Sequence, residues 1–114
     1  VEPLDRALAE RTAWMSGLRR GESAARATTP VVERDTRRGL VKVNPLATWS
    51  DDDVGNYAAE RDLPVHPLAS QGFGSIGCWP CTRPLAPGEH ARAGRWAGSS
   101  KTECGLHPAG DPGR

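Results

Sequence analysis

The sequence predicts a mixed α/β fold around a small core, from three observations. Leu4 and Leu8 lie on one face of an apolar helical pattern at the N-terminus. Two β-branched or aliphatic runs follow at residues 31–34 and 40–43, and a capped helical pattern begins at Ser50. The core is expected to be small because 13 Gly and 10 Pro among 114 residues leave few positions for regular structure.

The first half of the chain supplies the predicted helices and strands. Pro3 suits the first turn of a helix that weakens near Thr12. Residues 13–18 are predicted to form a short buried strand, and residues 19–23 a polar loop. Residues 31–34 and 40–43 are separated by the turn-like residues 35–39, so we expect the two strands to pair or to lie near one another.

The second helix is predicted with a defined start. Ser50 followed by Asp53 is a variant of the capping box, and the acidic residues there favour a helix N-terminus. Val54 and Tyr57 continue an apolar stripe that ends near Asp62. Gly55 should cost this helix about 1 kcal/mol relative to Ala.

The second half of the chain is predicted to be mostly loop. From Pro64 onward Pro and Gly recur every few residues, and no periodicity survives. Residues 1–107 are predicted to form part of one domain, and residues 108–114 a disordered tail. Because the chain begins at Val1 and a helical pattern starts at once, we expect a piece of a larger protein.

Charge and composition favour a cytoplasmic protein with no nucleic-acid or membrane partner. Fifteen Lys and Arg balance fourteen Asp and Glu to a net charge of +1. No apolar run approaches the ~18–20 residues of a membrane span. Three cysteines do not resemble a secreted disulfide framework, so in a reducing compartment they are expected to bind metal or react. Homo-oligomerisation is left open.

Cys78 and Cys81 form a Cys-x-x-Cys motif whose spacing brings two thiolates to one metal centre. A zinc knuckle, a pair of cluster ligands or a redox dithiol all fit the motif. The dithiol fits least well, because such a motif normally opens a helix after a strand, whereas this one lies in a Pro/Gly loop.

Cys104 lies 23 residues beyond Cys81 in the polar sequence ECGLH. Nearby cations would favour its thiolate, which is the nucleophilic form. Spacing also permits a rival, a structural Cys3His zinc site formed by Cys78, Cys81, Cys104 and His107. That rival is a binding module without catalysis.

Six stretches together resemble the assimilatory, thioredoxin-dependent adenylyl-sulfate reductases of the iron-sulfur type. They run in the expected order through about residues 1–107: VEPLDRAL, GLRRGES, VKVNPLATWSDDDV, LPVHPLASQGFGSIGCWPCTRP, ARAGRW and ECGLH. The pairing of ECGLH with an upstream GCxPCTRP is far more specific than a Cys-x-x-Cys alone.

The resemblance implies the C-terminal part of a Rossmann-like fold of the adenine nucleotide α-hydrolase type, with a loop-rich, cysteine-bearing C-terminal segment. It also implies a 4Fe-4S cluster for which Cys78 and Cys81 supply two of four ligands. In the family the other two ligands, and a substrate-facing lysine, precede the stretch matched by VEPLDRAL. We therefore expect residues 1–114 alone to be inactive.

The resemblance further implies the reaction. The Cys104 thiolate attacks the sulfur of adenylyl sulfate, AMP leaves, and a thiolate of thioredoxin or glutaredoxin releases sulfite from the S-sulfocysteine. Arg92, Arg95 and His107 match the family's substrate-binding residues, and Arg20 and Arg26 are weaker candidates for nucleotide contact. The Cys-x-x-Cys favours adenylyl sulfate over its 3′-phosphorylated form, although some cluster-bearing members accept both.

Overall fold

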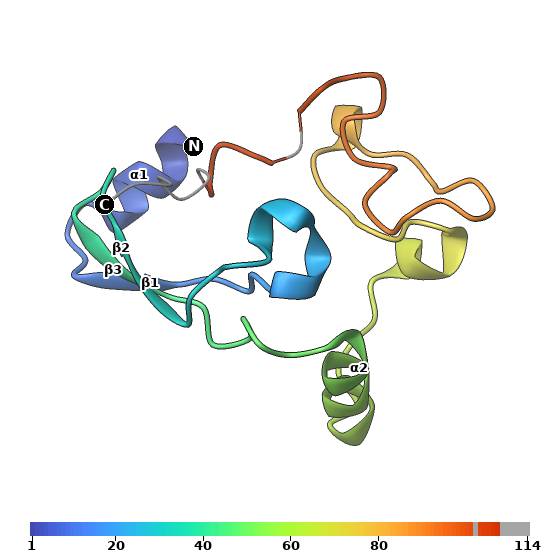
Figure 1. The fold of residues 1–114 in the computed structure, drawn as a ribbon, viewed down its shortest axis with the longest axis horizontal. Helices are drawn as coiled ribbons and strands as arrows, with labels where there is room; N and C mark the ends of the chain where they lie inside the picture. Colours follow the sequence, from blue (N-terminus) through green and yellow to red (C-terminus); the bar gives the residue numbers. More distant parts are fainter. Residues whose placement is uncertain (102, 108–114) are drawn as a thin grey trace. The chain divides into compact units, whose positions relative to one another are not determined.

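A computed structural model describes residues 1–101 and 103–107 (Figure 1). The predicted tail at 108–114 lies outside the described residues. The chain divides into two compact units. The sheet unit comprises residues 1–56 and the segment that begins at Glu103, and the loop unit comprises residues 57–102. The single domain predicted over residues 1–107 stays a prediction.

The sheet unit is built on three strands in the order β1-β3-β2 (Figure 1). They are β1 (Ala13–Met15), β2 (Val32–Asp35) and β3 (Leu40–Val43). β3 runs parallel to β1 and antiparallel to β2, which confirms the predicted pairing of the second and third strands. Gly39 in the connecting turn has φ +70°, a conformation that favours glycine.

The first strand is shorter and more exposed than predicted. β1 ends at Met15, whose side chain is 75% exposed, so the prediction of a buried strand over residues 13–18 is wrong in extent and burial. Beyond β1 the Ser16 hydroxyl bonds the Asn44 side chain and only Leu18 is buried. The strand therefore ends just before Ser16, whose side chain is hydrogen-bonded to the buried Asn44 amide.

The two faces of the sheet differ in character. Side chains alternate along a strand, so the register places Trp14, Glu33 and Lys42 on one face. The opposite face carries Met15, Val32 and Val41, and all three of these apolar residues are exposed. The polar face is therefore the one on which the sheet unit packs its other segments.

The predicted N-terminal helix is confirmed as α1 (Glu2–Leu8). It is attached to the β2–β3 turn by Arg38, whose Nε donates to Asp5 at 2.7 Å and whose Nη1 donates to Asp35 at 2.9 Å. The Arg38 and Asp35 side chains are only 6% and 5% exposed. The Arg38 hydrogen bond is the main reason that the pKa of Asp5 lies below its usual value.

The core is small, as predicted, and partly polar. Ala47 and Asn44 are fully buried. The Asn44 amide nitrogen donates to the Pro30 carbonyl and to Glu33, both at 2.9 Å, and its oxygen accepts from Ser16. Because both ends of this buried amide are hydrogen-bonded, these bonds offset the cost of its burial, and the side chain links the loops around the sheet.

The second predicted helix is confirmed as α2 (Asp51–Glu60). The Asp53 backbone N–H donates to the Ser50 hydroxyl at 3.0 Å, and the Ser50 N–H donates to the Asp53 carboxylate at 2.8 Å. The predicted capping box is therefore present. The backbone hydrogen bond from Ser50 lowers the pKa of Asp53.

The loop unit confirms the prediction of little regular structure after Pro64. Described residues 64–101 contain two short 3-10 helices, Pro67–Gln71 and Trp79–Cys81, and one isolated bridge between Thr82 and Arg95. None of the helices in the described part of the chain is both long and apolar enough to cross a bilayer.

Candidate functional site

The Cys78–Cys81 turn is held by local hydrogen bonds. The Cys81 N–H donates to the Cys78 carbonyl at 2.9 Å. The Thr82 hydroxyl donates to the same carbonyl at 2.9 Å and accepts from the Gly77 N–H at 3.1 Å. The Trp96 N–H donates to the Cys81 carbonyl at 2.9 Å. Both cysteines are free thiols, so the turn presents two unblocked sulfur donors.

Two thiols on one turn fit half of a four-cysteine cluster set. Within residues 1–101 and 103–107, no three His, Cys, Asp or Glu side chains gather as a metal-ligand group. The Cys3His alternative draws Cys78 and Cys81 from the loop unit, and Cys104 and His107 from the sheet unit. That alternative is untested.

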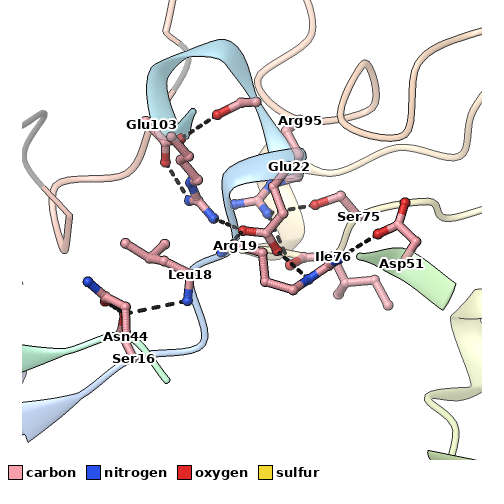
Figure 2. A network of polar contacts seen from close by, with 12 residues as sticks. Ser16, Leu18, Arg19, Glu22, Asn44, Asp51, Ser75, Ile76, Arg95 and Glu103 are labelled. Carbon is pink, nitrogen blue, oxygen red and sulfur yellow. Dashed lines mark hydrogen bonds and ion pairs between the residues drawn. The ribbon is translucent and has the colours of Figure 1, made fainter. Parts of the chain in front are cut away.

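Three cations surround one indole ring beside the cysteine turn. Arg95, Arg92 and Lys101 place their charges 4.6, 5.8 and 5.8 Å from the Trp96 ring. Arg95 Nη1 also donates to the Ser75 hydroxyl at 3.3 Å and to the Ile76 carbonyl at 3.1 Å (Figure 2). This cationic cluster is suited to an anion, because guanidinium groups bind phosphate and sulfate oxygens.

Close backbone packing fixes Arg95 in this cluster. A Cβ atom added at Gly77 would meet the Arg95 guanidinium, so a larger residue there would displace the Arg95 side chain. Arg95 Nε is buried and has no hydrogen-bond partner among the described residues. The predicted substrate residue Arg95 therefore lies directly against the chain that enters the cysteine turn.

Cys104 lies in the sheet unit, in a turn that we call the 103–107 turn. The His107 N–H donates to the Cys104 carbonyl at 3.2 Å and closes the turn. Glu103 accepts hydrogen bonds from Arg26 Nε at 2.7 Å and Nη2 at 2.6 Å. The Cys104 thiol is free and half-buried.

His107 stacks on Trp14, with ring centroids 5.8 Å apart and planes 8° from parallel. Burial, followed by the charges of Lys42 and Arg26, lowers the pKa of His107 below its usual value. Its buried Nδ1 has no hydrogen-bond partner among the described residues. The surroundings of the imidazole therefore favour its neutral form.

A small polar pocket of about 80 Å³ lies beside the 103–107 turn. Arg26, Glu33, Lys42, Glu103 and His107 are among its lining residues. Lys42 is nearly buried and pairs with Glu33 at 2.8 Å. The lining includes two basic and two acidic side chains, so their charges largely neutralise one another.

The two weaker predicted nucleotide contacts differ in environment. Arg20 is exposed, and its Nε donates to the Thr29 carbonyl at 2.8 Å. Arg26 is half-buried, and its Nε, Nη1 and Nη2 all donate to carboxylates, those of Glu22 and Glu103.

Sequence reasoning missed Glu103, Glu22 and Trp14 as neighbours of the predicted site residues. The only signal in the sequence was that Glu103 belongs to ECGLH. Nothing in residues 20–26 indicates a partner about 80 positions away.

The predicted site residues thus fall into two groups. The sheet unit contains Cys104 and His107 together with Arg20 and Arg26. The other four, Cys78, Cys81, Arg92 and Arg95, belong to the loop unit.

Comparison with known proteins accounts for most of the chain. Residues 1–84 match the phosphoadenosine phosphosulfate reductase domain. The chain is 56% identical over 107 residues to the adenosine 5′-phosphosulfate reductase of Streptomyces coelicolor, covering 94% of this chain and 45% of that protein. It is 57% identical over 109 residues to the phosphoadenosine 5′-phosphosulfate reductase of Gloeobacter violaceus, with the same coverage. The chain thus spans less than half the length of these two relatives.

A solved structure supports the fold. The phosphoadenylyl-sulfate reductase of Candida auris, in a phosphate complex, superposes with a TM-score of 0.58 at 36% identity over 69% of this chain and 37% of that one. The expected α/β class is therefore confirmed, as part of a Rossmann-like fold. The chain belongs to the phosphoadenosine phosphosulfate reductase domain family.

Proposed function

We propose that the complete protein reduces adenylyl sulfate to sulfite and AMP in assimilatory sulfate reduction, with Cys104 as nucleophile. The observation that carries the proposal is that the ECGLH cysteine is a free, half-buried thiol in an anchored turn, in a chain of this family. A nucleophile needs access to substrate together with a fixed position.

The proposed reaction has two steps. The Cys104 sulfur attacks the sulfur of adenylyl sulfate, an S–S bond forms, the S–O bond to the phosphate breaks, and AMP leaves with the electron pair. A thiolate of thioredoxin or a related dithiol protein then attacks the Cys104 sulfur and releases sulfite. Its second thiol resolves the mixed disulfide, so the dithiol supplies the two electrons and regenerates Cys104.

The proposed roles of the cations follow from their chemistry. Arg92 and Arg95 would bind the phosphosulfate, because guanidinium groups neutralise the charge that develops on a phosphate leaving group. His107 is proposed to contact the substrate as well, and Arg20 stays a weaker candidate for the nucleotide. A preference for adenylyl sulfate over its 3′-phosphorylated form is part of the proposal.

Cys78 and Cys81 are proposed to hold a 4Fe-4S cluster together with two cysteines from outside this chain. Their turn supports the proposal because it offers two free thiols fixed by backbone hydrogen bonds. When bound, the cluster would have a structural and electrostatic role close to the substrate and would not supply electrons. The chain's own contribution is to fix the turn that carries the two sulfur atoms, which contacts Arg95 and Trp96.

Replacing Cys104 by Ser in the complete protein tests the proposal. Iron content should stay unchanged and sulfite release should be abolished, whereas Cys78→Ser or Cys81→Ser should lose iron. Sulfite formation by the Cys104→Ser variant would overturn the assignment of the nucleophile. Under the zinc alternative Cys104→Ser would instead reduce metal binding, so the same variant separates the two functions.

A further inference from the structure

The residue immediately before Cys104 is fixed by an arginine from a distant part of the sequence. The Arg26 guanidinium meets both carboxylate oxygens of Glu103, Nε to Oε1 at 2.7 Å and Nη2 to Oε2 at 2.6 Å. The two side chains are only 12% and 14% exposed. A bidentate pair with so little solvent contact is stronger and more directional than a surface ion pair.

Arg26 is also held by a second carboxylate, that of Glu22. Its Nη1 donates to Glu22 at 2.5 Å, and Glu22 accepts from the Arg19 backbone N–H at 3.1 Å. The Ser23 hydroxyl adds a contact to Glu103 at 3.2 Å. Figure 2 shows Glu22 and Glu103 in this network of polar contacts. Burial alone would lower the pKa of Arg26, but the bonds to Glu103 and Glu22 raise it, so the charge persists.

The other end of the 103–107 turn has separate anchors. Arg37 Nη1 donates to the Gly105 carbonyl at 3.3 Å, and the His107 ring stacks on Trp14. Cys104 therefore lies between two fixed points, Glu103 on one side and Gly105 with His107 on the other. Loss of either point would release the thiol from its position.

We infer that the Arg26–Glu103 pair positions the Cys104 thiol for attack, so that Arg26 acts through Glu103 and not by contacting the nucleotide. This inference rests on the proposed role of Cys104. Its physical basis is that a reacting atom must be held close to its attack geometry, and a displacement of about 1 Å can cost on the order of a hundredfold in rate. Arg26 and Glu103 are thus positioning residues.

The test uses the complete protein with Arg26→Gln, Glu103→Gln and the double variant. The first readout is the rate of Cys104 alkylation by iodoacetamide, followed by the mass of the peptide that contains it. The second is kcat and KM for adenylyl sulfate. Each single variant should raise the alkylation rate about tenfold, as expected for loss of one charge-assisted contact. It should lower kcat about tenfold and leave KM within about twofold.

Two further variants sharpen the result. Arg26→Lys keeps the charge but lacks the planar fork, so its alkylation rate and kcat should fall between those of wild type and Arg26→Gln. The double variant should be no worse than the worse single variant, because both substitutions remove the same pair. Arg6→Gln is the matched control, since it removes an exposed ion pair with Glu2 and should change neither readout.

Three outcomes would overturn the inference. The first is an alkylation rate unchanged in both single variants. The second is faster alkylation with unchanged kcat. The third is a raised KM for Arg26→Gln with unchanged alkylation, which would make Arg26 a substrate contact. Far-UV circular dichroism and urea unfolding check the folding of each variant, because iron content reports only on the loop unit. Glu103→Gln and Arg26→Lys decide the question if Arg26→Gln does not fold. Alkylation of Cys104 does not require turnover, so it tests the positioning inference independently of the reaction. Sulfite release by the Cys104→Ser variant would reject the proposed function on its own.

Discussion

The two cysteine-bearing regions of the chain are held in place in different ways. The Cys78–Cys81 turn is fixed by backbone and threonine hydrogen bonds within its own few residues and by a backbone bond from Trp96, 15 positions beyond Cys81. The 103–107 turn is fixed by side chains from residues far away in sequence, with Arg26 and Trp14 as its chief anchors. Under the proposed function the first turn would hold two metal ligands, for which local spacing matters most. The second would hold a nucleophile, which must be aligned with a substrate that other segments bind.

This difference predicts that substitutions in the loop unit and in the sheet unit have separable effects. Changes that disturb the loop unit should affect iron binding and spare the environment of Cys104. Changes to the anchors in the sheet unit should do the opposite. The following substitutions test that separation in the complete protein.

Gly94→Ala should have the largest effect on the loop unit. A Cβ atom there would collide with the Arg83 carbonyl oxygen and push apart the segments joined by the Arg83 N–H to Gly94 carbonyl bond of 2.9 Å. We expect a loss of about 1–3 kcal/mol in the free energy of unfolding and reduced iron per chain, with normal Cys104 alkylation. Gly17→Ala is the control, because its Cβ would meet no atom within 4 Å. Full iron retention by Gly94→Ala would contradict the prediction.

Arg38→Gln should have the largest effect on the sheet unit. It leaves the Asp35 carboxylate, whose side chain is 5% exposed, without its charged partner. Loss of a hydrogen bond to a charged group costs roughly 1.5–3 kcal/mol. Arg38 also lies over the Trp14 ring at 5.5 Å, so the stacking of His107 should loosen. Urea unfolding measures the first effect and Cys104 alkylation the second. If Arg38→Gln lowered the iron content as strongly as it changed Cys104 alkylation, the two regions would not be separable.

His107 should make the anchor of the 103–107 turn sensitive to acid. Its pKa is lowered in the folded chain, first by burial and then by Lys42 and Arg26, against the opposing charge of Glu103. The neutral ring is therefore favoured on folding. The stability that the neutral ring contributes is fully present above pH 6.5, the usual pKa of histidine. It is lost as the pH falls from there through the pKa of His107 in the folded chain. NMR titration of the His107 ring should give a midpoint below 6.5, and a midpoint at or above 6.5 would contradict the stacked, half-buried ring.

Gly55→Ala should have the smallest effect and the opposite sign. Gly55 lies inside α2, and an added Cβ would meet no atom within 4 Å. Replacement by Ala should therefore raise the free energy of unfolding by up to about 1 kcal/mol. Both iron content and Cys104 alkylation should match wild type. A loss of stability on urea unfolding would show that α2 packs there against a segment outside this chain.

Much of the fold was predictable because its signals are local. The Ser50–Asp53 capping box, the paired runs of β2 and β3 and the loop after Pro64 depend on residues only a few positions apart. The strand at residues 13–18 was mispredicted because a run of apolar residues does not show which side chains will form hydrogen bonds with distant residues. Ser16 bonds Asn44, 28 positions away, and the strand ends at Met15.

The sequence by itself determined the cysteine spacing, the capped helix, the strand pairing and, through its motifs, the family. Only the tertiary structure decided that Arg26 pairs with Glu103, that His107 stacks on Trp14 and that one apolar face of the sheet is exposed. The physical reason is range. Backbone hydrogen bonding and periodicity act over a few residues and leave a readable pattern, whereas an ion pair between positions 26 and 103 forms only after the chain has folded.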